Sequence, residues 1–132
     1  MPAEGLDHIN IVSGDIARTV EFYEGLLGLE ARPIPVAPEG YGGRWIYDKH
    51  GHDVIHVQLH DPERHGARDG QPLDMGPLDH IAIVCTDFPG MCAKCDAMGL
   101  DYSTNHVEKM NFSQIFVRDP DNVLLELNFR NG

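Results

Sequence analysis

The chain has 132 residues, an ordinary apolar content of 42%, and 21 acidic against 10 basic side chains, which gives a formal net charge of −11. Such a charge repels phosphate backbones and anionic lipid, so we expect neither nucleic acid nor a membrane as a partner. The first residues show no basic region followed by an apolar run, and no segment reaches the roughly 18 apolar residues of a membrane span. We therefore expect a cytoplasmic protein with one globular domain.

Two nearly identical segments indicate an internal repeat. Residues 6–12 read LDHINIV and residues 78–84 read LDHIAIV, so the copies differ only where Ala82 replaces Asn10. A repeat of this kind indicates two copies of one supersecondary unit. We expect one domain over residues 1–132, with a first module at about 5–60, a linker at about 61–77 and a second module at about 78–130.

In the first module, the strand-like segment 6–12 is followed by apolar residues at three- and four-residue steps, which predict a helix. These residues are Ile16, Val20, Tyr23, Leu26 and Leu27. Ser13 or Asp15 can cap the start of the helix, and Gly28 fits its end. Three strands are then expected, at 29–34, 44–48 and 54–59, before a polar linker rich in Gly and Pro that we interpret as a loop.

The second module repeats this order. After the strand at 78–84, Asp87, Phe88 and Pro89 open a helix that stops at Gly99. Strands are expected at 100–104, 113–119 and 123–129, and the Pro-Asp-Asn turn at 120–122 separates the last two. Each module is therefore predicted to be β-α-β-β-β, which places the protein in the α+β class.

The three cysteines do not predict a disulfide framework, because their number is odd and nothing indicates secretion. Cys92 and Cys95 form a C-x-x-C pair, but they fall inside the predicted second helix. We interpret them as small residues on the helix face, and a redox pair is the alternative.

Strand alternation places four candidate ligands on one side of the sheets. With Ile9 and Ile11 packed inward, His8 takes the other face, and with Ile55, Val57 and Leu59 inward, His56 and Gln58 do the same. In the second module, Ile81 and Ile83 are expected to pack inward, so His80 lies on the outward face. Likewise, Leu125, Leu127 and Phe129 are expected to pack inward, so Glu126 and Asn128 lie on the outward face.

Because of the internal repeat, the set of four residues is a more specific indication of a metal site than any one of them alone. A single His or Glu in a strand is usually solvated or hydrogen-bonded, but His8 and His56 match His80 and Glu126, on the first and last strands of their modules. Three imidazoles and a carboxylate suit a divalent ion such as Fe(II), Mn, Co, Ni or Zn. We therefore predict one metal bound by these four side chains.

Other residues are expected near the metal. Gln58 and Asn128 lie two residues beyond candidate ligands and suit hydrogen bonds to substrate or to a ligand. Either Trp45 and Tyr47, or Arg44 and Ile46, face the substrate from their strand. His106 is a candidate acid or base.

The whole chain, roughly residues 6–130, resembles the vicinal-oxygen-chelate superfamily, which includes glyoxalases, bleomycin-resistance proteins and extradiol dioxygenases. The motifs that carry the resemblance are LDHINIV, DIARTVEFYEGLLGL, LDHIAIV and RDPDNVLLELNF. It implies paired βαβββ modules that form an open, cup-shaped mixed sheet with helices outside. It also implies a metal at His8, His56, His80 and Glu126, and often a homodimer.

The chain departs from bacterial glyoxalase I, which generally carries Glu where His56 stands, so a glutathione hemithioacetal is in doubt as substrate.

Three hypotheses remain for the function, each with a small molecule as substrate or ligand. The first is a lyase or isomerase that holds two adjacent oxygens, with Glu126 or His106 moving a proton. The second is an Fe(II) extradiol dioxygenase that uses His8, His80 and Glu126. The third is a metal-free drug-binding protein. Four ligands leave an octahedral ion two open positions, which favours the first.

Overall fold

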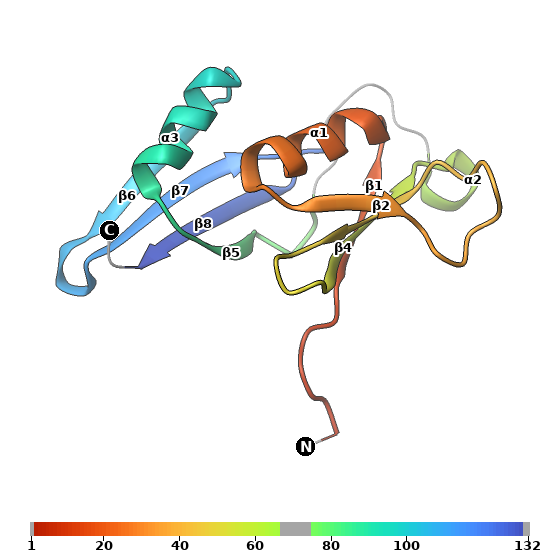
Figure 1. Cartoon of the computed structure of the whole chain (residues 1–132), viewed down its shortest axis with the longest axis horizontal. Helices are drawn as coiled ribbons and strands as arrows, with labels where there is room; N and C mark the ends of the chain where they lie inside the picture. The colour runs from red at the N-terminus through yellow and green to blue at the C-terminus, as the bar shows by residue number, and fades with distance from the viewer. Residues whose placement is uncertain (1, 67–74, 131–132) are drawn as a thin grey trace. The chain divides into compact units, whose positions relative to one another are not determined.

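The computed structural model describes residues 2–66 and 75–130 (Figure 1). The chain divides into two compact units, unit 1 at Met1–Asp69 and unit 2 at Gly70–Gly132. The boundary falls inside the predicted linker, of which residues 67–74 lie outside the described residues. The first part of that linker is not all loop, because Pro62–His65 forms the one-turn helix α2, capped by the Asp61 side chain.

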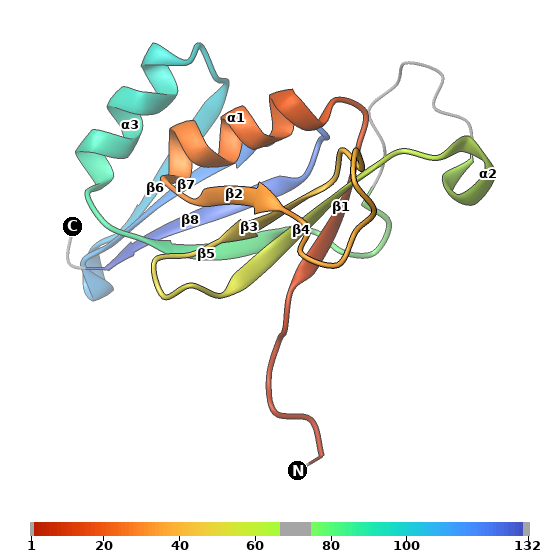
Figure 2. The same ribbon diagram turned by 45° about the vertical axis from the view of Figure 1, so that its right-hand side comes forward.

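Unit 1 contains a four-stranded mixed sheet in the order β1-β4-β3-β2. Strands β1 and β4 are parallel, whereas β4–β3 and β3–β2 are antiparallel, and α1 crosses one face of the sheet (Figure 2). The bounds are β1 Ile9–Ser13, α1 Ile16–Leu27, β2 Glu30–Pro33, β3 Arg44–Tyr47 and β4 Asp53–Leu59.

Unit 2 has the same topology, with the sheet order β5-β8-β7-β6 and a parallel β5–β8 pair. The bounds are β5 Ile81–Cys85, α3 Phe88–Ala97, β6 Tyr102–Val107, the single-turn 3-10 helix η1 Glu108–Met110, β7 Phe112–Arg118 and β8 Leu124–Arg130. The predicted α+β class with two tandem βαβββ modules is therefore confirmed. Among the described residues, no helix is long and apolar enough to cross a membrane.

Helix α1 begins and ends where its capping residues predict. The Asp15 carboxylate accepts a hydrogen bond from the Arg18 backbone at 3.2 Å, and Gly28 adopts the left-handed conformation with φ 69°. The buried face is rotated from the predicted one, because it also includes Thr19 and Phe22. The Thr19 hydroxyl is hydrogen-bonded to Ser13 at 2.8 Å, so a buried polar pair ties the helix to the end of β1.

The inward strand residues form the cores of the two units. They include Ile11, Ile46, Ile55 and Val57 in unit 1, and Ile115, Val117, Leu125, Leu127 and Phe129 in unit 2. The prediction that Leu59 is buried is wrong: it is 54% exposed, because β4 ends there. Ile81 and Ile83 are only half-buried, on a strand at the edge of its own sheet.

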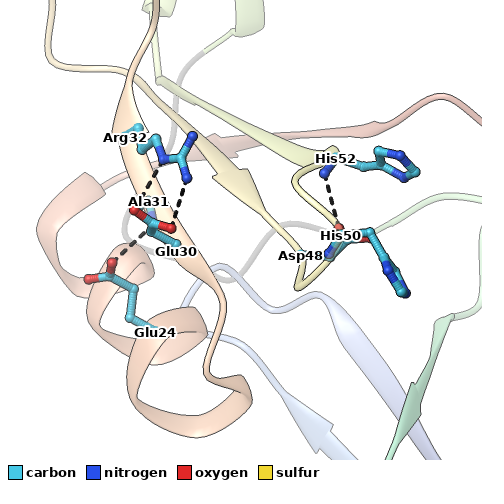
Figure 3. Close-up of polar contacts among 7 residues, drawn as sticks. All are labelled: Glu24, Glu30, Ala31, Arg32, Asp48, His50 and His52. Carbon is cyan, nitrogen blue, oxygen red and sulfur yellow. Dashed lines mark hydrogen bonds and ion pairs between the residues drawn. The ribbon is translucent and has the colours of Figure 1, made fainter.

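The turn that joins β3 to β4 is set by Asp48 (Figure 3). One oxygen of its carboxylate accepts hydrogen bonds from the backbone N–H groups of His50 and His52, at 2.8 and 3.0 Å. These bonds lower the pKa of Asp48 because they favour its charged form. The turn fixes the hairpin register in which Trp45 pairs with His56.

Two acidic side chains make polar contacts at the edge strand β2 (Figure 3). Glu24, on α1, accepts a hydrogen bond from the Ala31 backbone at 3.0 Å and so ties the helix to β2. Glu30 and Arg32 form an exposed ion pair at 2.9 Å, and the guanidinium lowers the pKa of the Glu30 carboxyl.

The cysteines do not have the environment of reactive thiols. Cys85, Cys92 and Cys95 are all unpaired, and Cys95 is fully buried on α3. Desolvation raises the pKa of Cys92 and Cys95, and it raises that of Cys85 to about 11. A redox role for the C-x-x-C pair has no support in this environment.

We predict that iodoacetamide at pH 8 alkylates Cys85 at least about tenfold more slowly in the folded protein than in urea, because burial suppresses its thiolate. Peptide mass spectrometry of samples quenched over time measures this rate. Equal rates in the two states would contradict the assigned environment.

Candidate metal centre

In unit 1 the topology brings His8 and His56 together. The parallel β1–β4 pairing places Asn10 beside His56, and His8 lies two residues before Asn10. The His8 and His56 rings stack with centroids 3.6 Å apart and planes at 17°. The antiparallel neighbour of His56, Trp45, also stacks on its ring, at 4.3 Å and 8°. The His56 ring therefore lies between Trp45 on β3 and His8 just before β1, and its side chain is 14% exposed.

Unit 2 brings His80 and Glu126 together in the same way. The parallel β5–β8 pairing places Ala82 beside Glu126, and His80 lies two residues before Ala82. His80 Nε2 lies 3.7 Å from Glu126 Oε1. Two donor atoms that each bind one ion at about 2.0–2.2 Å lie roughly 3 to 3.6 Å apart, so this pair is close to the separation that a shared metal requires.

The Asp-His dipeptide of each repeat orients its imidazole. His8 Nδ1–H donates to Asp7 at 2.5 Å, and His80 Nδ1–H donates to Asp79 at 2.8 Å. Carboxylates that accept from one ring nitrogen of a metal-binding histidine fix its tautomer and raise the basicity of the other nitrogen. Both residues are thus prepared to coordinate through Nε2.

His56 is oriented differently. Its Nε2, rather than Nδ1, is hydrogen-bonded to the Asp53 carboxylate, at 2.6 Å. This bond is the main cause of the lowered pKa of Asp53. His56 can therefore coordinate a metal through Nε2 only if Asp53 releases it, and otherwise only through Nδ1.

The alternatives for the third strand of unit 1 are resolved by burial. Ile46 is fully buried, so Trp45 faces the side of the sheet that carries His56. Tyr47 lies farther along β3, and the Arg32 guanidinium covers its ring at 4.4 Å. Gln58 donates to Asn10 at 2.7 Å, across the β1–β4 pair. The structure thus brings Trp45 to His56, whereas Tyr47 packs with β2.

The sequence did not identify Gln114 or Asn105. Asn128, 8% exposed, donates to Glu126 Oε2 at 3.0 Å and accepts from Gln114 at 3.1 Å. Gln114 in turn accepts from Asn105 at 2.9 Å. The available signal was the alternation of β7, where Gln114 falls between the buried Ser113 and Ile115.

The structure places His106, the candidate acid or base, on the other face of its sheet from Glu126. His106 pairs with Ser113 across β6–β7, and Ser113 pairs with Phe129 across β7–β8. Cross-strand partners share a face, so His106 lies on the helix-covered face, opposite Glu126. Its Nδ1 is hydrogen-bonded to the Ser113 hydroxyl at 2.9 Å. The sequence placed His106 after the strand, whereas β6 extends to Val107 and the extra residues settle which face it takes.

Among residues 2–66 and 75–130, no three or more His, Cys, Asp or Glu side chains gather into a cluster that could hold a metal. Each unit supplies one pair of the predicted set: imidazole with imidazole in unit 1, and imidazole with carboxylate in unit 2. The donor types and the orienting carboxylates nevertheless fit a divalent ion of the borderline class.

Comparison with known proteins agrees with this topology. The family model described as the Glyoxalase/Bleomycin resistance protein/Dioxygenase superfamily matches residues 5–127. A search of curated proteins finds no match.

Solved structures share the fold at low sequence identity. A glyoxylase/bleomycin resistance protein/dioxygenase domain from Frankia sp. EAN1pec has a TM-score of 0.73 at 16% identity, covering 97% of this chain and 93% of that one. The fosfomycin resistance protein FosX from Mesorhizobium loti has a TM-score of 0.68 at 19% identity, covering 96% and 92%. A FosX variant from Listeria monocytogenes, complexed with Mn(II) and 1S,2S-dihydroxypropylphosphonic acid, has a TM-score of 0.69 at 19% identity, covering 98% and 91%.

The ionisation of His80 tests the geometry of unit 2. The hydrogen bond to Asp79, helped by the charge of Glu126, raises the pKa of His80. The stabilisation from its charged form is complete below the ordinary pKa of about 6.5 and disappears as pH rises through the folded value. We predict that an NMR pH titration of the metal-free protein gives a raised His80 pKa, and that Asp79→Asn lowers it. An unchanged pKa in this variant would contradict the assigned hydrogen bond.

Proposed function

The chain belongs to the glyoxalase/bleomycin resistance protein/dioxygenase superfamily, and we propose that it is a metal-dependent lyase or isomerase. Its proposed substrate is a small molecule that binds through two adjacent oxygens. The proposed ligands of a single divalent ion are His8, His56, His80 and Glu126. Because the two pairs belong to different units, the ion would need one pair from each module, of one chain or of two.

The observation that carries the proposal is the repeated arrangement around the two repeat histidines. In each unit the histidine that precedes the first strand donates Nδ1–H to its neighbouring aspartate and meets a candidate ligand of the last strand. A solvated strand face has no need of an orienting carboxylate beside each of these imidazoles. The identity of the metal is left open among Fe(II), Mn, Co, Ni and Zn.

A divalent ion held by these residues would act as a Lewis acid toward the two oxygens of the substrate. The protein residues have separate proposed roles. Glu126, hydrogen-bonded through Oε2, is the group that takes and returns a proton. Trp45 covers His56 and limits the access of water. Gln58 lies on the same strand face as His56 and is proposed to bind substrate, as is Tyr47 at the end of β3.

One observation favours a second function. If Asp53 keeps Nε2 of His56, the remaining ligands are His8, His80 and Glu126. Two histidines and one carboxylate form the facial triad of non-haem Fe(II) oxygenases and leave room for O₂. The metal-free binding protein is less favoured, because the oriented histidines have no role in it. The homodimer and the cytoplasmic location stay predictions.

We predict that the protein binds about one divalent ion per chain and that His80→Ala loses most of it. Elemental analysis after loading with Fe, Mn, Ni or Zn measures the stoichiometry. Ni(II) should also quench the fluorescence of Trp45, the single tryptophan, because this residue stacks on a proposed ligand. The matched control is His106→Ala, which removes a histidine of the same unit from the opposite face and should retain the metal. A stoichiometry near zero for all four metals would overturn the proposal.

The reaction class depends on His56. If His56 coordinates the metal, His56→Ala should weaken metal binding by about tenfold or more. Even the loss of a residue that only hydrogen-bonds to a ligand lowers metal affinity about 10- to 100-fold. Catechols should then bind the Fe(II)-loaded protein in air without ring cleavage, and activity should be sought with hemithioacetals of α-ketoaldehydes and with vicinal diol phosphonates. Rapid formation of a yellow ring-fission product, or full metal retention by His56→Ala, would favour the dioxygenase instead.

A further inference from the structure

Unit 2 contains a chain of three side-chain amides that runs across three strands and ends on Glu126. Asn105 on β6 donates to Gln114 on β7 at 2.9 Å, and Gln114 donates to Asn128 on β8 at 3.1 Å. Asn128 then donates to Glu126 Oε2 at 3.0 Å. The strand register places these residues in line, because Asn105 pairs with Gln114 and Gln114 pairs with Asn128.

The direction of this chain is set by its acidic end. An ionised carboxylate can only accept hydrogen bonds, so Asn128 must present its NH₂ group to Glu126. The carbonyl of Asn128 is then left to accept from Gln114, and the carbonyl of Gln114 is left to accept from Asn105. Each amide thus donates toward Glu126, and neither Gln114 nor Asn128 can rotate without breaking two bonds. Asn128 is 8% exposed, so water is a poor substitute as its partner.

The two carboxylate oxygens of Glu126 consequently have different surroundings. Oε2 is occupied by Asn128, whereas Oε1 lies on the side of His80, 3.7 Å from Nε2. Among the described residues of unit 1, no equivalent amide chain ends on His56. The residues that match Ala82 and Glu126 there are Asn10 and His56, and the amide of Gln58 donates to Asn10 instead. The amide chain is therefore a feature of the module that supplies the carboxylate.

We propose that Gln114 and Asn105, acting through Asn128, are positioning residues that hold Glu126 so that it binds the metal through Oε1 alone. This inference rests on the proposed metal-binding function. By occupying Oε2 with an amide donor, the chain would disfavour bidentate coordination and so keep a position on a bound ion open for the substrate. Hydrogen bonds to ligating carboxylates typically change metal affinity by 10- to 100-fold when they are removed, so the chain carries a measurable share of binding.

The test is a double-mutant cycle between Gln114→Leu and Glu126→Gln. Manganese affinity is measured by competition with a chelator, and the thermal midpoint of the metal-free protein is measured alongside it. We expect Gln114→Leu to weaken manganese binding by about tenfold, and to have little further effect once Glu126 is replaced. Asn105→Leu, one amide farther away, should have a smaller effect in the same direction. The control is Thr104→Val, next to Asn105 but on the opposite face of β6, which should bind manganese as the wild type does.

A second readout separates positioning from a structural role. The infrared carboxylate bands of the manganese-loaded wild type should show the wide splitting of a monodentate carboxylate, and Gln114→Leu should narrow it. Weaker binding that persists in the Glu126→Gln background, or unchanged bands in Gln114→Leu, would overturn the inference. If the wild type binds manganese and Glu126→Gln weakens it but Gln114→Leu does not, the inference fails and the proposed function stands. If the wild type binds no metal at all, both fail.

Discussion

The candidate site depends on the parallel pairing of the first and last strands of each module. This pairing places Asn10 beside His56 in unit 1 and Ala82 beside Glu126 in unit 2. The histidine two residues before each of these positions then meets the candidate ligand on the last strand. Residues far apart in the sequence become neighbours through backbone hydrogen bonds alone, so the pairs form before any ion is present.

Around each pair, hydrogen-bonded side chains restrict which atom would face a bound metal. Asp7 and Asp79 hold the Nδ1 atoms of the repeat histidines, and an amide chain holds one oxygen of Glu126. His56 differs, because Asp53 holds its Nε2 and two aromatic rings stack on it. The proposed choice between lyase or isomerase chemistry and oxygen activation depends on this one residue, since it would decide whether a bound ion has three or four protein ligands.

Sequence periodicity predicted the elements and the faces of the central strands, because buried and less buried residues alternate along much of β4 and β8. It failed where a residue lies at a strand end or an edge. Leu59 is exposed where β4 stops, and His106 was expected after the strand although β6 extends to Val107. The amide chain could not be predicted either: Asn105, Gln114 and Asn128 align only through the register of three strands, which a single sequence does not contain.

We propose above all that the carboxylates and amides hydrogen-bonded to the proposed ligands determine which atom of each ligand binds the metal. A crystal structure of the manganese-loaded protein, with the ion located by anomalous scattering, tests it most directly. We predict an ion bound by His56 together with Nε2 of His8, Nε2 of His80 and Oε1 of Glu126, with Oε2 still bonded to Asn128. An ion bound away from these residues, or a bidentate Glu126 that has released Asn128, would contradict it.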